Sequence, residues 1–166
     1  MPSPDRPFVR SSNYVRDLRD AVNRVTPKLL ALGDASAKPP APGKWSPREI
    51  IGHLVDSATN NYGRVVRGQL QDDLVFPGYA QDDWVRIGRY RDAPWDELVT
   101  LWRTINLQLA RVMEGTPEDV RRRPRERHSF DAIGVPLMAG EAATLEHVMN
   151  DYVGHLKHHL RQIFPD

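Results

Sequence analysis

Apolar residues recur every three or four positions along four separate stretches of the chain. This spacing puts them on one face of a helix, and no stretch shows the strict alternation of a half-buried strand. The predicted helices cover roughly residues 12–32, 46–70, 93–114 and 144–164. Four amphipathic helices predict an all-α four-helix bundle, and the length of 166 residues fits a single domain over residues 1–166.

The second predicted helix has the clearest start signal in the chain. Ser46 suits the N-cap position, Pro47 suits the first helical position, and Glu49 completes a capping box. Thr144 is a comparable cap for the fourth helix. Pro27 lies inside the first helix, so we expect a kink there or a break just before it.

Two histidines of the fourth predicted helix share its apolar face. His155 and His159 are four residues apart, so they stack about 6 Å apart along the helix axis. Neutral imidazoles at this spacing supply half of a site for Zn²⁺ or Ni²⁺. The alternative is a pair of hydrogen-bonded histidines in the core.

His53 of the second helix supplies a third imidazole if the second and fourth helices run antiparallel. It lies about 10 Å from the N-terminal end of its helix, and the midpoint of His155 and His159 lies about 10 Å from the C-terminal end of theirs. A simple up-down-up-down bundle would make these two helices parallel. The connection over residues 71–91 is long enough to cross the bundle, so we expect an up-down-down-up topology with a long crossover between helices 2 and 3.

Two carboxylates lie within one helical turn of the candidate ligands. Asp56 and Asp151 are candidates to orient a ligand ring or to act as a general base, against the alternative of surface carboxylates or helix-face ion pairs. His158 points about 100° away from its neighbour on the helix, so we expect it at the rim of the site or in solvent. His128 and His147 are expected at the surface. Three imidazoles leave coordination positions open, which is typical of a catalytic metal site.

The two longest connections carry weaker signals. Residues 81–89 predict a short helix that lays Trp84 and Ile87 over an edge of the core. Residues 121–125 form a basic cluster, which we interpret as a solvated loop, with phosphate binding as the alternative.

Composition narrows the chemistry further. The chain contains no cysteine, which excludes disulfides, thiolate nucleophiles and cysteine-ligated metals, so any metal must bind to His, Asp or Glu. The 23 Lys and Arg residues are mixed with 22 Asp and Glu residues, so the net charge of +1 gives no bias toward nucleic acid or anionic lipid. No apolar run reaches the ~18–20 residues of a membrane span, and the N-terminus lacks the apolar core of a signal peptide. We therefore expect a soluble, cytoplasmic protein without a membrane or nucleic-acid partner.

Three motifs contain the candidate residues. They are Lys-Trp-Ser-Pro-Arg-Glu-Ile-Ile-Gly-His-Leu-Val-Asp at 44–56, Gly-Tyr-Ala-Gln-Asp-Asp-Trp at 78–84, and Asp-Tyr-Val-Gly-His-Leu-Lys-His-His-Leu at 151–160. Together they resemble the DinB/YfiT-like superfamily over about residues 44–164. The resemblance implies an up-down-down-up bundle, frequent homodimers, and a divalent metal, usually Zn²⁺ or Ni²⁺, on three histidines. The matching positions here are His53, His155 and His159.

The resemblance also implies an activity on a small-molecule substrate. Characterised members of the superfamily resemble either metal-dependent hydrolases or transferases that use a low-molecular-weight thiol such as bacillithiol or mycothiol. Neither reaction demands a residue that the other lacks, so both remain open. A non-catalytic metal-binding or small-molecule-binding module is the alternative from a different class. DNA binding, which the name of the superfamily suggests through DNA damage, is disfavoured by the balanced charge.

Overall fold

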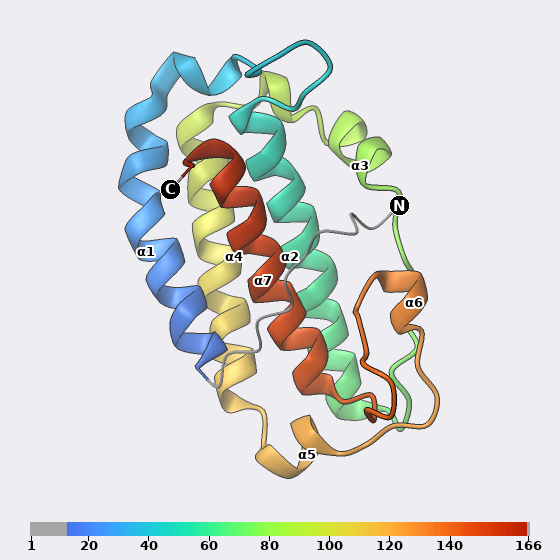
Figure 1. The fold of residues 1–166 in the computed structure, drawn as a ribbon. Coiled ribbons are helices and arrows are strands. Elements are labelled where there is room, and N and C mark those ends of the chain that lie inside the picture. Colours follow the sequence, from blue (N-terminus) through green and yellow to red (C-terminus); the bar gives the residue numbers. More distant parts are fainter. Residues whose placement is uncertain (1–12, 166) are drawn as a thin grey trace.

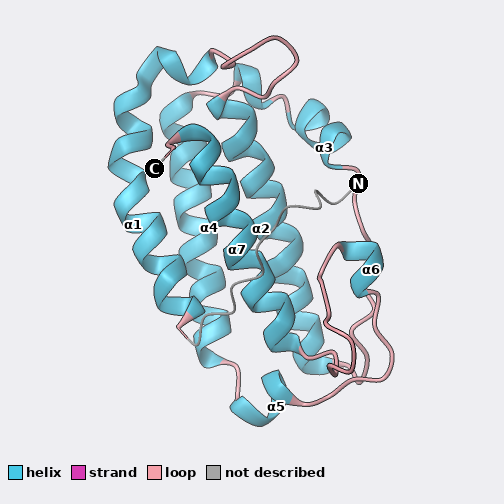
Figure 2. Cartoon of the chain, in the orientation of Figure 1, coloured by secondary structure: helices cyan, strands magenta, loops and turns pink. Residues whose placement is uncertain are grey.

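Four long helices form the body of the molecule, as the apolar periodicity predicts (Figure 1). The structure, a computed structural model, describes residues 13–165. The long helices are α1 (Tyr14–Leu32), α2 (Pro47–Leu70), α4 (Trp95–Gly115) and α7 (Leu145–Ile163). Shorter helical segments lie between them: η1 (Gly33–Ala37), α3 (Gln81–Gly88), η2 (Tyr90–Asp92), α5 (Glu118–Arg122) and α6 (Phe130–Ile133). The all-α prediction is confirmed, and Figure 2 shows only helices and loops in the described part of the chain.

The long helices surround one core. α2 packs against α4 and α7, and α1 packs against the same two helices. Figure 1 shows that α2 and α4 begin at the upper end of the bundle, whereas α1 and α7 begin at the lower end. α2 therefore runs antiparallel to α7. The chain returns from the end of α2 to the start of α4 through residues 71–94, and α3 and η2 lie against α2 on the way.

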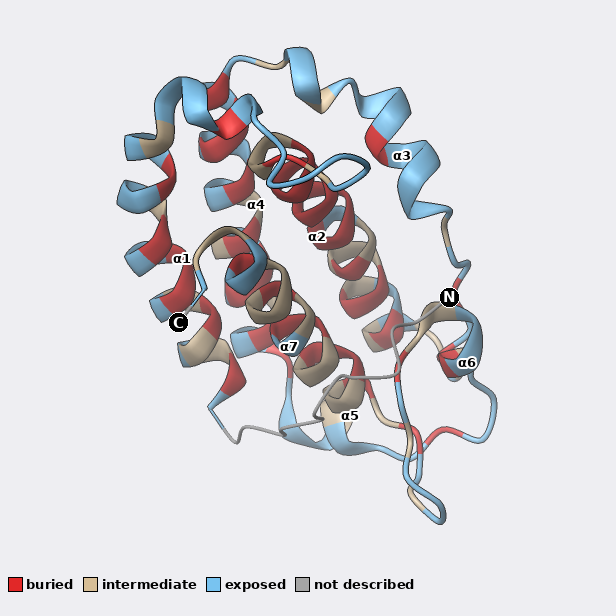
Figure 3. Ribbon diagram, turned by 45° about the horizontal axis from the view of Figure 1, so that its top comes forward, coloured by how far each residue is buried: buried red, intermediate tan, exposed pale blue. Residues whose placement is uncertain are grey.

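The buried faces of the long helices meet in a continuous apolar core (Figure 3). Trp102 of α4 and Tyr152 of α7 are its largest fully buried side chains. The hydroxyl of Tyr152 donates a hydrogen bond to the side-chain oxygen of Asn106 on α4. A buried phenol and a buried amide thus satisfy each other, which offsets the cost of removing both from water. None of the helices in residues 13–165 is long and apolar enough to cross a lipid bilayer.

The predicted start of α2 is confirmed in atomic detail. The backbone N–H of Glu49 donates to the side chain of Ser46, and the carboxylate of Glu49 accepts from the backbone N–H of Ser46 at 2.9 Å. Thr144 caps α7 by accepting from the backbone N–H of His147. Of the kink or break expected at Pro27, the break does not occur, because α1 continues through the proline. Buried residues on both sides of the proline keep α1 packed against the core, which offsets the lost backbone hydrogen bond.

The short helix α3 forms where it is predicted, but a different side faces the bundle. Val85 is its buried residue, whereas Trp84 and Ile87 are 40% and 68% exposed. The expectation that Trp84 and Ile87 cover the core is therefore wrong. The ring of Trp84 packs instead against Tyr79, with 5.0 Å between the ring centroids.

The basic cluster at 121–125 is partly structural. Arg125 is only 5% exposed, and its guanidinium donates to the backbone oxygens of Gly68 and Gln71 at the end of α2 and to that of Val120. A cation at this position satisfies the free carbonyls of a helix C-terminus and complements the helix dipole. The interpretation of the whole cluster as a solvated loop is therefore wrong for Arg125.

The remaining histidines divide between surface and interior. His128 is exposed, as predicted. The side chain of His147 is only 11% exposed, and its Nδ1 lies 2.6 Å from the hydroxyl of Thr144. The expectation of a surface position for His147 is therefore wrong, since the imidazole is part of the capping interaction at the start of α7.

Candidate metal centre

Three imidazoles from two helices meet near the upper end of the bundle. His53 lies on α2, and His155 and His159 lie one turn apart on α7. One ring nitrogen from each lies within 4.8 Å of the others. The closest pair is Nε2 of His53 and Nε2 of His155, 3.0 Å apart. These are the three residues that the helical levels predict to meet.

The local sequence fixes the height and direction of each ring. The capping box sets the start of α2 and so places His53 two turns into the helix, on the side that packs against α7. His53 is 1% exposed, and its imidazole packs against the rings of Trp45, His155 and His159. The i,i+4 spacing brings His155 and His159 onto one face, with 4.5 Å between their ring centroids.

A glutamine orients the third imidazole. Nδ1 of His159 lies 3.0 Å from Oε1 of Gln162, one turn further along α7. A carboxamide oxygen only accepts hydrogen bonds, so this contact is compatible with the tautomer that carries its proton on Nδ1 and leaves the lone pair on Nε2. A hydrogen bond of this kind fixes the tautomer that suits a metal ligand.

Trp45 covers the cluster and was missed by sequence reasoning. Its ring centroid lies 5.1 Å from that of His53 and 6.5 Å from that of His159. Trp45 directly precedes the N-cap of α2, so its position follows from the same capping box. An aromatic lid restricts the access of water to the ring nitrogens beneath it.

His158 lies beside the cluster but is not one of its three members. Its ring centroid is 5.3 Å from that of His159, and its Nε2 lies 3.5 Å from the amide nitrogen of Gln162. The expected position at the rim agrees with this placement.

The carboxylate of Asp56 is hydrogen-bonded to Tyr90. Its Oδ1 accepts a hydrogen bond of 2.6 Å from the hydroxyl of Tyr90 in η2, and the carboxylate is 7% exposed. Burial raises the pKa of Asp56, and the hydrogen bond from Tyr90 opposes that shift. The Tyr90 ring rests directly on the backbone of Gly52, where an added Cβ would lie 2.1 Å from it. This contact anchors η2 to α2.

Asp151, in contrast, lines the same cavity as the histidines. This cavity of about 800 Å³ extends from His53 and His155 toward the loop over 78–83 and the segment 130–136. Its wall on α7 includes Asp151, one turn before His155. Of the two predicted carboxylates, Asp151 is therefore the one that shares a space with the imidazoles.

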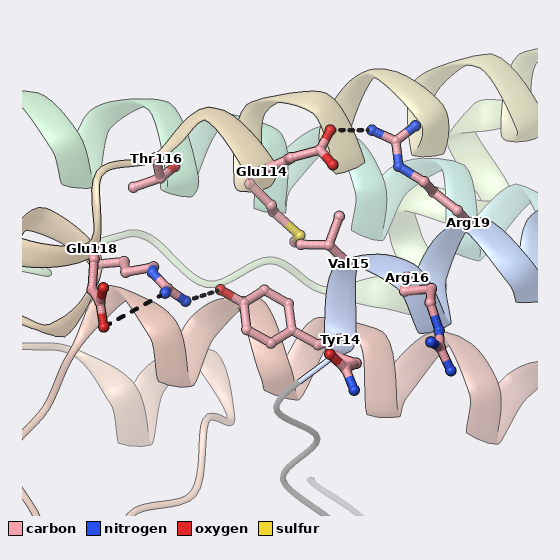
Figure 4. A pocket seen from close by; sticks show the side chains of 10 residues that line it. Tyr14, Val15, Arg16, Arg19, Glu114, Thr116 and Glu118 are labelled. Atoms are coloured by element: carbon pink, nitrogen blue, oxygen red, sulfur yellow. Dashed lines mark hydrogen bonds and ion pairs between the residues drawn. The ribbon is translucent and has the colours of Figure 1, made fainter.

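A second cavity lies beside the N-terminal end of α1, next to the end of α4 and to α5 (Figure 4). It has a volume of about 620 Å³, and ion pairs hold several of its charged lining residues. Arg19 pairs with Glu114 at 2.7 Å, and Arg121 donates to the hydroxyl of Tyr14 and to Glu146 of α7. No histidine lines this cavity among the residues that the structure describes. Its polar groups hold α1, α4 and α5 together.

Comparisons with known proteins identify the family and agree with the fold. The model of the DinB superfamily matches residues 13–163. A relative from Geobacillus thermodenitrificans (strain NG80-2) named "Putative metal-dependent hydrolase" is 23% identical over 150 residues, which cover 90% of this chain and 78% of the relative. A relative of the same description from Bacillus licheniformis is 22% identical over 151 residues, covering 90% of this chain and 81% of the relative.

A solved structure shares the fold. YfiT from Bacillus subtilis, whose structure is described as a probable metal-dependent hydrolase with an unusual four-helix bundle topology, superposes with a TM-score of 0.74 at 19% sequence identity. The match covers 90% of this chain and 81% of that chain. The four-helix bundle prediction is therefore confirmed by a structural neighbour.

Proposed function

Because this chain belongs to the DinB superfamily, we propose that it is a metal-dependent hydrolase of a small molecule, with His53, His155 and His159 as the metal ligands. One observation carries the proposal: three ring nitrogens from two helices lie within 4.8 Å of one another at one end of a cavity of about 800 Å³. A cavity of this size accommodates a small organic molecule. The names of the two bacterial relatives support the reaction class.

The donor set fits a divalent metal. Neutral imidazole nitrogens are preferred ligands of Zn²⁺ and Ni²⁺, and three of them leave open positions for a substrate. When bound, such an ion supplies Lewis acidity, which polarises a substrate oxygen and lowers the pKa of water or of a thiol. The contact between Nδ1 of His159 and Oε1 of Gln162 is compatible with the tautomer in which Nε2 coordinates a metal.

Asp151 is the proposed proton acceptor of the hydrolase. Its carboxylate lines the cavity one turn from His155, where it faces the space that a substrate would occupy. Hydrolysis needs a group that removes a proton from water, and a carboxylate within reach of the reacting atoms performs this role. Asp56 is instead bonded to Tyr90, so we assign it a structural role.

Transfer to a low-molecular-weight thiol is the second candidate. A thiol ionises near neutral pH when a metal or a cation is close, so it needs no general base. The engagement of Asp56 by Tyr90 leaves one of the two predicted carboxylates in the cavity, which favours a reaction with fewer proton transfers. The variant Asp151→Asn separates the two candidates, since it should abolish hydrolysis and leave thiol transfer largely intact.

Metal content tests the site itself. Protein purified without a nickel column should contain about one Zn²⁺ or Ni²⁺ per chain by elemental analysis. His53→Ala and His159→Ala should lose the metal but keep the helical circular dichroism spectrum, because the apolar core does not depend on these side chains. His158→Ala is the matched control and should retain the metal. Retained metal in either ligand variant, or none in the wild type after metal addition, would contradict the site.

Turnover then separates an enzyme from a binding module. A metal-loaded protein that hydrolyses or transfers none of a broad panel of small esters, amides and thiol–electrophile pairs would favour the non-catalytic alternative. Activity that disappears with a chelator and returns with added metal would support the proposal.

A further inference from the structure

A row of polar side chains runs along α2 below the histidine cluster. His53, Ser57, Asn61 and Arg64 all line the cavity of about 800 Å³. Their spacing of four, four and three residues keeps them on one face of the helix. This face lies within the bundle, where an amphipathic helix would normally present apolar residues. The row therefore marks a surface that is shaped for a polar ligand.

Arg64 is the charged end of this row and is unusually buried. It is 6% exposed, and its guanidinium donates to Oδ1 of Asn61 at 3.4 Å and to the backbone oxygen of Pro77 at 3.3 Å. Both acceptors are neutral, and both distances are long for a charged donor. No ion pair joins Arg64 to a carboxylate within residues 13–165. Burial lowers the pKa of Arg64, which reflects the loss of hydration around the cation.

Four carboxylates line the same cavity: Asp82 and Asp83 of α3, Asp131 of α6 and Asp151 of α7. The negative charge of Asp151 opposes the effect of burial on the pKa of Arg64. Of these carboxylates, Asp83 is paired with Arg86 at 3.0 Å. Among the residues that the structure describes, Arg64 is the one arginine that lines this cavity.

We propose that Arg64 binds a carboxylate group of the substrate while the bond that reacts lies at the histidine cluster. The planar guanidinium fork matches a carboxylate with two parallel hydrogen bonds. A singly charged carboxylate fits better than a doubly charged phosphate, because Asp151 lies near enough to repel the anion. This inference rests on the proposed function and narrows its substrate to small carboxylic acids.

The helix geometry sets the length of that substrate. Arg64 follows His53 by 11 residues, which is about 16 Å along the axis of α2. Arginine side chains on a helix lean toward its N-terminus, and this brings the guanidinium back by about 5 Å. The carboxylate and the reacting atom should therefore be separated by about 10 Å, the length of an extended chain of about nine atoms.

A bifunctional probe tests the spacing directly. Co²⁺-loaded protein would be titrated with 8-mercaptooctanoate and with 8-mercaptooctan-1-ol, which differ only in the distal group, and binding would be followed by the thiolate-to-cobalt absorption. Wild type should bind the acid about tenfold more tightly than the alcohol. Arg64→Gln should lose this preference, whereas Arg67→Gln, an exposed arginine one turn away on the same helix, should keep it. Equal affinities in wild type, or a preference that survives in Arg64→Gln, would overturn the proposal.

A metal-free experiment keeps this inference separate from the metal site. In protein treated with a chelator, the side-chain Nε–Hε signal of Arg64 would be followed by ¹⁵N nuclear magnetic resonance during titration with hexanoate or hexan-1-ol. Hexanoate should shift this signal saturably and hexan-1-ol should not. If cobalt fails to bind but hexanoate shifts the signal, the metal proposal fails and the anion site stands.

A conservative variant covers the case in which Arg64→Gln does not fold. Arg64→Lys keeps the charge but loses the bidentate fork, so it should retain part of the preference for the acid. An Arg64→Lys protein that discriminates as strongly as wild type would contradict the bidentate contact. Absence of any hexanoate-induced shift in wild type would overturn the proposal independently of every variant.

Discussion

The buried pair of Asp56 and Tyr90 gives a quantitative test of how the crossover is attached to the bundle. Tyr90→Phe removes the hydroxyl that donates to Oδ1 of Asp56 at 2.6 Å and leaves the ring packed on Gly52. The carboxylate is 7% exposed, so little water replaces the lost donor. A hydrogen bond to a charged group contributes about 1.5–3 kcal/mol, and we expect the free energy of unfolding at neutral pH to fall by about that amount.

The loss should depend on pH with a definite sign. Burial raises the pKa of Asp56 above its unfolded value, so the stability contributed by this carboxyl is present below the unfolded pKa and is lost as the pH rises through the folded pKa. Removing the Tyr90 hydroxyl, which opposes the shift, raises the folded pKa further. The deficit of Tyr90→Phe should therefore be largest at neutral pH and should shrink as the pH is lowered.

Urea unfolding followed by circular dichroism measures both effects. Wild type and Tyr90→Phe would be compared at neutral pH and at about pH 5. Tyr62→Phe is the matched control, because it removes a phenol from α2 for which the structure describes no hydrogen bond, and its stability should stay within about 0.5 kcal/mol of wild type. A Tyr90→Phe protein as stable as this control, or a deficit that does not change with pH, would refute the reasoning.

Two further predictions concern the same end of the bundle. Gly52→Ala would place a Cβ 2.1 Å from the Tyr90 ring, so its unfolding free energy should fall by about 1–3 kcal/mol, and the double variant with Tyr90→Ala should show a smaller additional loss than Gly52→Ala causes alone. The ring centroids of Trp45 and His53 are 5.1 Å apart, so Ni²⁺ or Co²⁺ bound at the histidines should quench the tryptophan fluorescence of the wild type. Trp45→Phe should lose most of this quenching, although Trp84, Trp95 and Trp102 remain. Equal quenching in Trp45→Phe would place the bound metal elsewhere.

The parts of the fold that sequence reasoning captures are set by local rules. The apolar spacing defines the four long helices, and the Ser46–Glu49 capping box defines the start of α2 to the residue. Once α2 has a fixed start, the height of His53 follows from the rise per residue, as does that of the pair on α7. The meeting of the three histidines then follows from helix geometry together with the antiparallel arrangement that the long connection over 71–91 allows. The matching sequence motifs point to the same three residues.

The parts that sequence reasoning missed depend on the path of the connections. Apolar periodicity does not reveal that residues 71–94 bring Tyr90 onto Gly52. The sequence therefore did not predict the hydrogen bond between Tyr90 and Asp56. The burial of Arg125 could not be foreseen either, because its partners are carbonyls of α2, more than fifty residues earlier in the chain. Such contacts follow from tertiary packing, which overrides the preference of arginine for the surface. The expected homodimer and cytoplasmic location stay predictions.

The polar row on α2 shows why burial and chemistry have to be considered together. Ser57, Asn61 and Arg64 interrupt an otherwise apolar face, and a bundle that needed only stability would have filled this space with apolar side chains. Burying the Arg64 cation removes its hydration, which lowers the stability of the fold unless an anion compensates for the loss. Its two neutral acceptors compensate only in part. A substrate carboxylate would supply the missing charge. The same feature that makes α2 a less stable bundle helix thus makes it one wall of a binding site that ends at the histidines.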